Sequence, residues 1–228
     1  HYKCFVAYNT LNFEGLNIPP FDKRKLLQSY GITTKKNIII TGRIQKRKRI
    51  QDLLDAFGLL PKNDIGLIIV GPVDKDLKLS FPKNKDKIHF LGSCYGIKAL
   101  QLMMASDVYC IPGAIGLSIV DAQYCGLPVV TEDVEHGPEI MYLKDKINGF
   151  IVPFSDVKAL ANRLELLLTN DELRRSFLKS AKNEMSTQGK GNINRLCEGF
   201  LTCLEFLLNS RGQCIRGDIS NIRLNNLL

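Results

Sequence analysis

The chain has 228 residues, 45% of them hydrophobic and 24% charged, which is a normal globular composition for one large domain or one and a half ordinary ones. No apolar run approaches the roughly 20 residues that a membrane-spanning helix needs, and we expect neither a membrane span nor a signal peptide. The net charge of +8 indicates an anionic ligand or a phospholipid surface; nucleic acid is not expected, because basic and aromatic residues do not interleave.

Strand patterns recur along the first two thirds of the chain. The strand-like segment Cys4–Tyr8 comes first, as if the chain had been cut from something longer, and a short amphipathic helix is expected over 22–30. Apolar runs of the kind found in parallel sheets covered on both faces predict six strands, at 37–42, 66–72, 87–92, 107–111, 127–131 and 149–153.

Helical patterns separate these strands and then fill the rest of the chain. Apolar spacing and capping residues predict helices at 50–60, 95–105, 117–125, 155–168, 171–185 and 193–208. The alternation predicts a Rossmann-like α/β fold, with a parallel sheet of about six strands, helices on both faces and a helical C-terminal third. We divide the chain into a lead-in at 1–36, a Rossmann-like domain at 37–185 and a C-terminal helix and tail at 186–228.

Chemically interesting residues gather at the carboxyl ends of the predicted strands, where ligands of such sheets bind. After the fourth strand, Gly113 and Gly116 let the backbone turn and leave N–H groups open. The helix predicted over 117–125 would point its N-terminus at a phosphate or at sugar hydroxyls. A lone Gly-x-x-Gly is more often an ordinary β–turn–α connection, so the neighbouring features decide.

A basic segment follows the first buried strand directly. Arg43 stands at the strand's end and Lys48 five residues on, so the guanidinium and the ammonium could clamp a diphosphate together. A solvated basic loop explains the same residues equally well. Further basic residues lie in the tail, at Arg211, Arg216 and Arg223.

Four other side chains at this edge each allow two interpretations. Asp121, in the helix after the glycines, could accept hydrogen bonds from ribose hydroxyls or be a partly exposed helix residue. Gly137-Pro138-Glu139 could place the Glu139 carboxylate at the start of a helix, where the dipole favours it with or without a ligand. We expect His136 to be a loop histidine rather than a general base. The Tyr95 side chain could lie beside the base of a bound nucleotide or in the core.

The seven cysteines form no Cys-x-x-Cys pair, and Cys110 and Cys125 lie inside apolar runs. An odd number argues against a complete disulfide set, so a reduced compartment is the better interpretation. With only three histidines and no spacing typical of metal ligands, we expect no metal site.

The order of these features resembles the C-terminal domain of GT-B glycosyltransferases, in particular the retaining family-4 type (glycosyl transferases group 1). The similarity covers roughly residues 37–185, and Tyr8–Leu11 resembles the interdomain crossover of that family, so 1–36 holds that crossover. The matching segments are 39–43 with Lys48, 67–71, 88–92, 105–108, 116–130, 138–139 and 148–152.

The resemblance implies a donor-binding domain for a UDP- or GDP-linked sugar, with Arg43 and Lys48 on the diphosphate and no cofactor or metal. In the family, two glutamates eight residues apart grip the donor sugar and the ribose. Here the second is Asp121, and the first falls at Gly113, so backbone N–H groups or Glu139 would contact the sugar. The remaining donor-site residues are then Gly42, Gly92, Ser93, Cys94, Ala114, Ile115, Gly116 and Leu117, with those at 92–94 near the base.

The resemblance also implies transfer of the glycosyl group, with retained configuration, to a saccharide or lipid-linked acceptor held by an N-terminal domain that this sequence lacks. The chain alone would be inactive, and the protein cytoplasmic, with a peripheral place on the inner face of the membrane left open. A degenerate nucleotide-sugar-binding or regulatory module is the alternative. A sugar-phosphate isomerase of the epimerase fold would need a carboxylate pair where this chain has Gly113.

Overall fold

A computed structural model describes residues 4–61, 64–186 and 189–209 and contains one six-stranded parallel sheet at its centre. The strand order is β3-β2-β1-β4-β5-β6, so the direction of winding reverses between β1 and β4. Each neighbouring pair is parallel, which confirms the predicted Rossmann-like sheet. The strands are β1 Lys36–Thr41, β2 Ile65–Val70, β3 Ile88–Phe90, β4 Val108–Cys110, β5 Val129–Glu132 and β6 Gly149–Val152.

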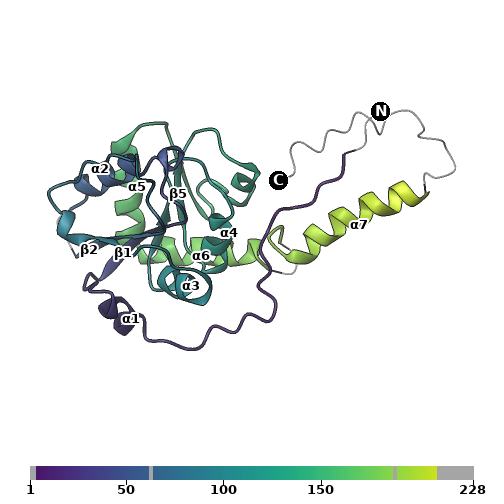
Figure 1. The fold of residues 1–228 in the computed structure, drawn as a ribbon, viewed down its shortest axis with the longest axis horizontal. Helices are drawn as coiled ribbons and strands as arrows, with labels where there is room; N and C mark the ends of the chain where they lie inside the picture. Colours follow the sequence, from purple (N-terminus) through teal and green to yellow (C-terminus); the bar gives the residue numbers. More distant parts are fainter. Residues whose placement is uncertain (1–3, 62–63, 187–188, 210–228) are drawn as a thin grey trace.

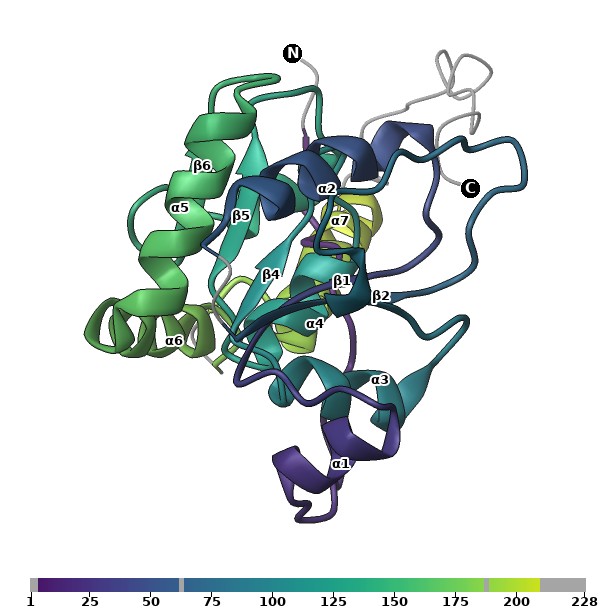
Figure 2. The same cartoon turned by 90° about the vertical axis from the view of Figure 1, so that its left-hand side faces the viewer.

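Helices cover both faces of the sheet (Figures 1 and 2). In both views α2 and α5 lie on one face, and α3 and α4 lie on the other. The helices are α1 Lys23–Ser29, α2 Ile50–Leu59, α3 Gly96–Met104, α4 Ser118–Tyr124, α5 Val157–Thr169, α6 Asp171–Glu184 and α7 Ile193–Asn209. The described residues also form short 3-10 helices, which are η1 Lys46–Lys48, η2 Lys85–Lys87 and η3 Pro138–Tyr142.

The core consists of the central strands and the helix faces packed on them. Ile38, Ile39 and Ile40 of β1 are fully buried, as expected for a strand covered on both faces. Asp156 begins α5 by accepting a hydrogen bond from the Ala159 amide, at 2.8 Å. These apolar runs and caps explain why the predicted strands and helices form where they do.

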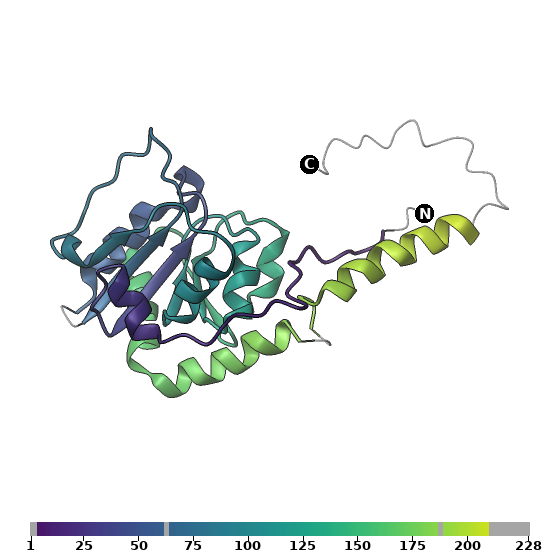
Figure 3. The same cartoon turned by 60° about the horizontal axis from the view of Figure 1, so that its bottom comes forward.

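Two parts of the chain differ from the expectation. Cys4–Tyr8 forms no strand, because no neighbouring strand is there to pair with it; instead Phe5 contacts Phe206 of α7, with ring centroids 5.4 Å apart. Figure 3 shows this segment running beside α7, which projects from the body of the domain. Glu132, one residue beyond the strand predicted at 127–131, is the last residue of β5 and fully buried.

The division into three parts stays a prediction, and the basic residues Arg211, Arg216 and Arg223 lie outside the described residues. Among the helices of the described part, none combines the length and the apolar character needed to cross a membrane.

Candidate functional site

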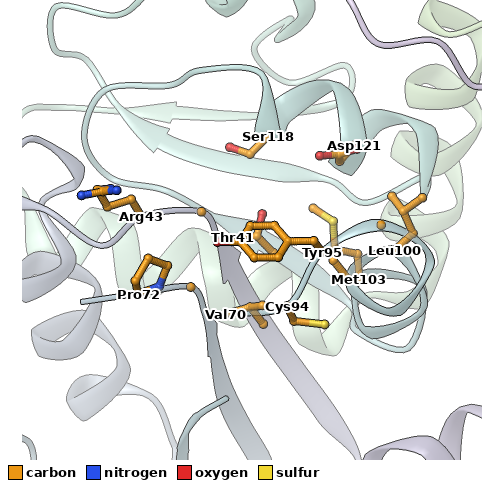
Figure 4. Close-up of a pocket in the computed structure, with 14 residues that line it drawn as sticks. Thr41, Arg43, Val70, Pro72, Cys94, Tyr95, Leu100, Met103, Ser118 and Asp121 are labelled. Atoms are coloured by element: carbon orange, nitrogen blue, oxygen red, sulfur yellow. The ribbon is translucent and has the colours of Figure 1, made fainter. Parts of the chain in front are cut away.

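A pocket of about 380 Å³ opens at the carboxyl ends of β1 and β2, against the starts of α3 and α4 (Figure 4). It therefore lies at the edge of the sheet where the sequence predicts a ligand, beside the point where the strand order reverses. Its lining residues are Thr41, Gly42, Arg43, Val70, Gly71, Pro72, Cys94, Tyr95, Gly96, Ala99, Leu100, Met103, Ser118 and Asp121.

Arg43 occupies one end of this pocket (Figure 4). Its side chain is 67% exposed, and its ion pair with Asp74 is long, at 3.8 Å between Nη1 and Oδ1. An exposed pair of this length contributes little stability, so the guanidinium can turn to an anionic ligand at small cost. Its fork of N–H donors suits a phosphate.

Asp121 extends into the same pocket from α4, beside Ser118 (Figure 4). Within the described residues no hydrogen bond or ion pair reaches its carboxylate. Burial raises the pKa of this carboxyl from 3.8 to about 6. The hydroxyl of Ser118, in contrast, accepts a hydrogen bond from Tyr109, at 2.8 Å. Asp121 is therefore an acceptor that lacks a donor, and ligand hydroxyls in the pocket could supply one.

Lys48 lies outside the pocket lining, on the side of η1 that faces the loop after β4. The residue is 6% exposed, and its ammonium donates to the carbonyl oxygen of Ala114, at 2.9 Å. Burial lowers the pKa of Lys48 from 10.5 to about 8; the positive charge of Arg47 lowers it further, and the negative charge of Glu139 opposes both. A partly desolvated cation of this kind interacts strongly with an approaching phosphate.

Backbone hydrogen bonds hold the loop from Gly113 to Leu117 against η1. The amides of Gly113 and Ala114 donate to the carbonyls of Lys48 and Arg47, at 3.1 and 2.9 Å. A Cβ added at Gly113 would lie 2.0 Å from the Arg47 oxygen, so the loop in this conformation has no room for a side chain there. Where the family pattern has the first of its two glutamates, the backbone of η1 therefore occupies the space of the side chain.

Fewer backbone N–H groups face a ligand than the sequence suggests. The Ala114 amide donates to the Arg47 carbonyl, and the Ile115 amide donates to Nδ1 of His136, at 3.2 Å. Among the described residues, only the amides of Gly116 and Leu117 from the expected set 114–117 have no hydrogen-bond partner. Because α4 has only seven residues, its dipole is also smaller than that of the longer helix predicted over 117–125.

His136 and Glu139 close the other side of this loop. The imidazole accepts from Ile115, so its proton is on Nε2, which donates to the carbonyl oxygen of Glu132 at 2.8 Å. This arrangement makes His136 a clamp between two segments of the chain. Glu139 accepts a hydrogen bond from the side chain of Asn9, at 2.9 Å.

The predicted site residues fall into two groups. The pocket brings together Gly42, Arg43, Cys94 and Asp121, while the loop side brings together Lys48 and the segment from Gly113, with Glu139 beyond it. Gly92 and Ser93 do not line the pocket: Gly92 accepts from the Gly71 amide, at 2.7 Å, and Ser93 is exposed. Tyr95 is 76% exposed beside the pocket and is not a core tyrosine.

Sequence reasoning missed a buried charge cluster behind the loop side. Nε of Arg49 lies 3.1 Å from Oε2 of the fully buried Glu132, and Arg49 also pairs with Asp52. The Ser155 amide donates to the same Glu132 oxygen, at 3.1 Å. Burial and nearby Asp52 raise the pKa of Glu132, and Arg49 and the Ser155 amide oppose them. The cluster fixes η1, and with it Lys48, to the end of β5.

Ser118 and Asn9 were missed as well. A serine at the start of a predicted helix was the available signal for Ser118, whereas nothing near Asn9 in sequence indicates its contact with Glu139, 130 residues away. In the described part of the chain, no three His, Cys, Asp or Glu side chains form a group that could hold a metal ion. Metal-independent ligand binding stays a prediction.

Comparisons of sequence and of structure find known proteins that are similar to this chain. Residues 22–184 match the family model described as glycosyl transferases group 1. The chain is 32% identical over 172 residues to the phosphatidyl-myo-inositol mannosyltransferase of Mycobacterium leprae, which covers 72% of this chain and 45% of that protein. The chain thus spans about half the length of the curated relatives it matches.

Two solved structures show the same fold. Alr3699/HepE from Anabaena in complex with UDP-glucose superposes with a TM-score of 0.73 at 22% identity, over 88% of this chain and 57% of that one. The C-terminal domain of the group 1 family protein LpcC from Francisella tularensis superposes with a TM-score of 0.60 at 21% identity, over 75% of this chain and 94% of that one.

Proposed function

The chain belongs to the glycosyl transferases group 1 family, and on this basis we propose that it forms the donor-binding part of a glycosyltransferase and binds a nucleoside-diphosphate sugar. The observation that carries the proposal is the pocket at the sheet edge, where an exposed guanidinium and a carboxylate without a donor line one cavity. A nucleotide presents the matching groups, since its phosphates accept from Arg43 and its ribose hydroxyls donate to Asp121. The Anabaena protein in complex with UDP-glucose supports this class of ligand.

In the proposed complex the two groups of residues divide the donor between them. The pocket holds the nucleoside, with Asp121 on the ribose and with Cys94 and Tyr95 near the base. The diphosphate then extends from Arg43 towards Lys48 and the loop. When the bond between the anomeric carbon and the diphosphate oxygen breaks, negative charge grows on the leaving nucleoside diphosphate, and the two cations stabilise it. The acceptor hydroxyl oxygen forms the new bond to the anomeric carbon, and its proton passes to the oxygen of the leaving diphosphate.

The acceptor would bind to a part of the protein outside this chain. The name of the M. leprae relative, a phosphatidyl-myo-inositol mannosyltransferase, supports a lipid-linked acceptor, and a saccharide is the other expectation. Retention of configuration, a cytoplasmic location and contact with the inner face of the membrane belong to the same proposal. The chain alone should bind the donor without transferring its sugar.

A second candidate is a nucleotide-sugar-binding module that has lost transfer activity. The observation in its favour is Gly113, where the loop backbone leaves no room for the side chain that the family pattern places there. This candidate shares the pocket and the diphosphate contacts, and differs only in the fate of the sugar. Turnover by a longer polypeptide that contains this chain would exclude it.

Calorimetry on the 228-residue chain with UDP, GDP, ADP and their sugars, in EDTA and again in Mg²⁺, tests the proposed function. We expect one nucleoside diphosphate to bind weakly in EDTA and little better in Mg²⁺. The Arg43→Ala variant should lose most of this affinity, because a charge-assisted bidentate contact is worth about 1.5–3 kcal/mol. Absence of binding, or binding strictly dependent on the divalent ion, would contradict the proposal.

A further inference from the structure

Asn9 joins the segment that precedes the domain to η3, the short helix that carries Glu139. The Asn9 carbonyl oxygen accepts a hydrogen bond from the Tyr142 hydroxyl, at 2.7 Å, and Tyr142 is fully buried. The next residue, Thr10, donates from its buried hydroxyl to the Gly191 carbonyl, at 2.7 Å. The backbone at Asn9 is therefore fixed from two directions, which gives its exposed side chain a defined starting point.

From this fixed backbone the Asn9 side chain reaches Glu139. Its amide nitrogen donates to Oε1, at 2.9 Å. Within the described residues, no other hydrogen bond and no ion pair holds the Glu139 carboxylate. Because a carboxylate on a flexible side chain needs such a contact to keep one orientation, the direction of Glu139 depends on Asn9.

The second carboxylate oxygen of Glu139 folds back towards the loop. A Cβ built at Gly137 would lie 2.6 Å from Oε2 of Glu139 and 3.2 Å from the carbonyl oxygen of Ile115. The carboxylate therefore occupies space that a side chain at Gly137 would take, beside the loop that begins at Gly113. The negative charge of Glu139 also raises the pKa of Lys48, on the other side of that loop.

We propose that Asn9 is a positioning residue that orients Glu139 towards the donor sugar, where Glu139 supplies the carboxylate that Gly113 cannot; this rests on the proposed function. Asn9 occupies Oε1 and leaves Oε2 free to accept from sugar hydroxyls. The proposed nucleoside and diphosphate contacts lie on other residues, so the direct effect of Asn9 falls on the sugar.

The test compares the affinity for a nucleotide sugar with that for its nucleoside diphosphate, by calorimetry of UDP-glucose against UDP and of GDP-mannose against GDP. In the Asn9→Ala chain we expect the nucleotide sugar that binds the unaltered chain to lose about three- to tenfold in affinity, with its nucleoside diphosphate unchanged. Asn9→Asp, which keeps the shape and adds a repelling charge, should lose at least as much. Asn9→Ala should add nothing in a Glu139→Ala background.

Asn12→Ala is the matched control. Asn12 lies on the same segment, and among the residues that the structure describes its side chain accepts only from the Glu14 amide, at 2.9 Å. This variant should bind both ligands as the unaltered chain does. A melting temperature for each variant separates loss of orientation from loss of folding.

Three results from the variants would overturn the inference without contradicting nucleotide binding by the unaltered chain. In the first, Asn9→Ala loses affinity for UDP and for UDP-glucose equally. In the second, the affinity losses of Asn9→Ala and Glu139→Ala add in the double variant. In the third, Glu139→Ala loses affinity for the nucleotide sugar alone and Asn9→Ala does not. An unaltered chain that binds each nucleotide sugar no better than its nucleoside diphosphate would also exclude a sugar contact by Glu139. If the unaltered chain binds no nucleotide at all, the proposed function fails and this inference fails with it.

Discussion

The buried ammonium of Lys48 should make the proposed diphosphate binding depend on pH. Its pKa in the folded chain is about 8, so raising the pH from 7 to 9 removes most of its charge. An uncharged amine attracts a diphosphate only weakly, and affinity should therefore fall over this window. Stability should change in the opposite direction: between about 8 and 10.5 the unfolded chain binds more protons at Lys48 than the folded chain, so the free energy of unfolding rises with pH.

The size of the effect follows from the fraction of charged lysine. At pH 9 a group with a pKa of about 8 is only about one-tenth protonated, whereas at pH 7 it is almost fully protonated. If the bound diphosphate requires the ammonium, affinity falls about tenfold from pH 7 to pH 9, or about 1.4 kcal/mol. Binding near pH 8–9 should also take up a proton from the buffer, because the phosphate charge raises the pKa of Lys48 in the complex.

Calorimetry at pH 7, 8 and 9, in buffers with different ionisation heats, measures both quantities. Lys48→Met should bind the diphosphate more weakly at pH 7 and lose the proton uptake and the slope that come from Lys48. Lys46→Met is the matched control, because Lys46 is exposed on the same short helix and should leave the slope intact. Titration of the nucleotide phosphates contributes equally to the measurements on the unaltered chain, Lys48→Met and Lys46→Met. The same slope in Lys48→Met as in the unaltered chain would refute the reasoning.

Three further predictions concern the pocket and the loop. Arg43→Ala should cost about 1.5–3 kcal/mol of diphosphate affinity and Arg47→Ala about 1 or less, since Arg47 is a screened surface charge; equal losses would indicate a diffuse basic patch. Asp121→Asn should weaken the binding of ribonucleotides by about 1–2 kcal/mol relative to that of their 2′,3′-dideoxy analogues. It should also raise the melting temperature above pH 6, where the raised pKa makes the buried carboxylate destabilising, and a parallel loss for both ligands would point to altered folding. Gly113→Ala should destabilise the chain by about 2 kcal/mol or more in thermal unfolding, whereas Gly116→Ala, with open space around its Cβ, should be neutral; equal effects would mean that the loop adapts.

The fold could be predicted because its signals are local. The run Ile38–Ile40 is apolar on both faces of a strand, and such a run is typical of the centre of a parallel sheet. Glu132 carried no such signal. A glutamate after a buried strand normally begins a loop, and only the pairing with Arg49, 83 residues earlier, explains why this one is buried.

For the candidate site, the sequence predicts which residues lie at the sheet edge but not which of their hydrogen-bonding groups are available. Arg43 and Asp121 follow from topology, because residues at the ends of parallel strands and at the starts of the helices after them meet at one edge. Which donors remain available to a ligand depends on contacts distant in sequence. His136, 21 residues beyond Ile115, accepts a hydrogen bond from the Ile115 amide, which the loop sequence alone leaves available to a ligand.

Gly113 links these observations to catalysis. Its lack of a side chain is accompanied by a backbone arrangement in which the Gly113 amide bonds to the carbonyl of Lys48 and the loop lies against Arg47. The same backbone contact holds η1, and the Lys48 ammonium of η1 donates in turn to the Ala114 carbonyl in the loop. A glutamate introduced at position 113 would therefore have to displace the loop that supports Lys48, and Gly113→Glu should lower the affinity for the diphosphate rather than raise the affinity for the sugar. If the protein transfers a sugar, the acidic contact must come from outside this loop, and Glu139 is the carboxylate placed beside it.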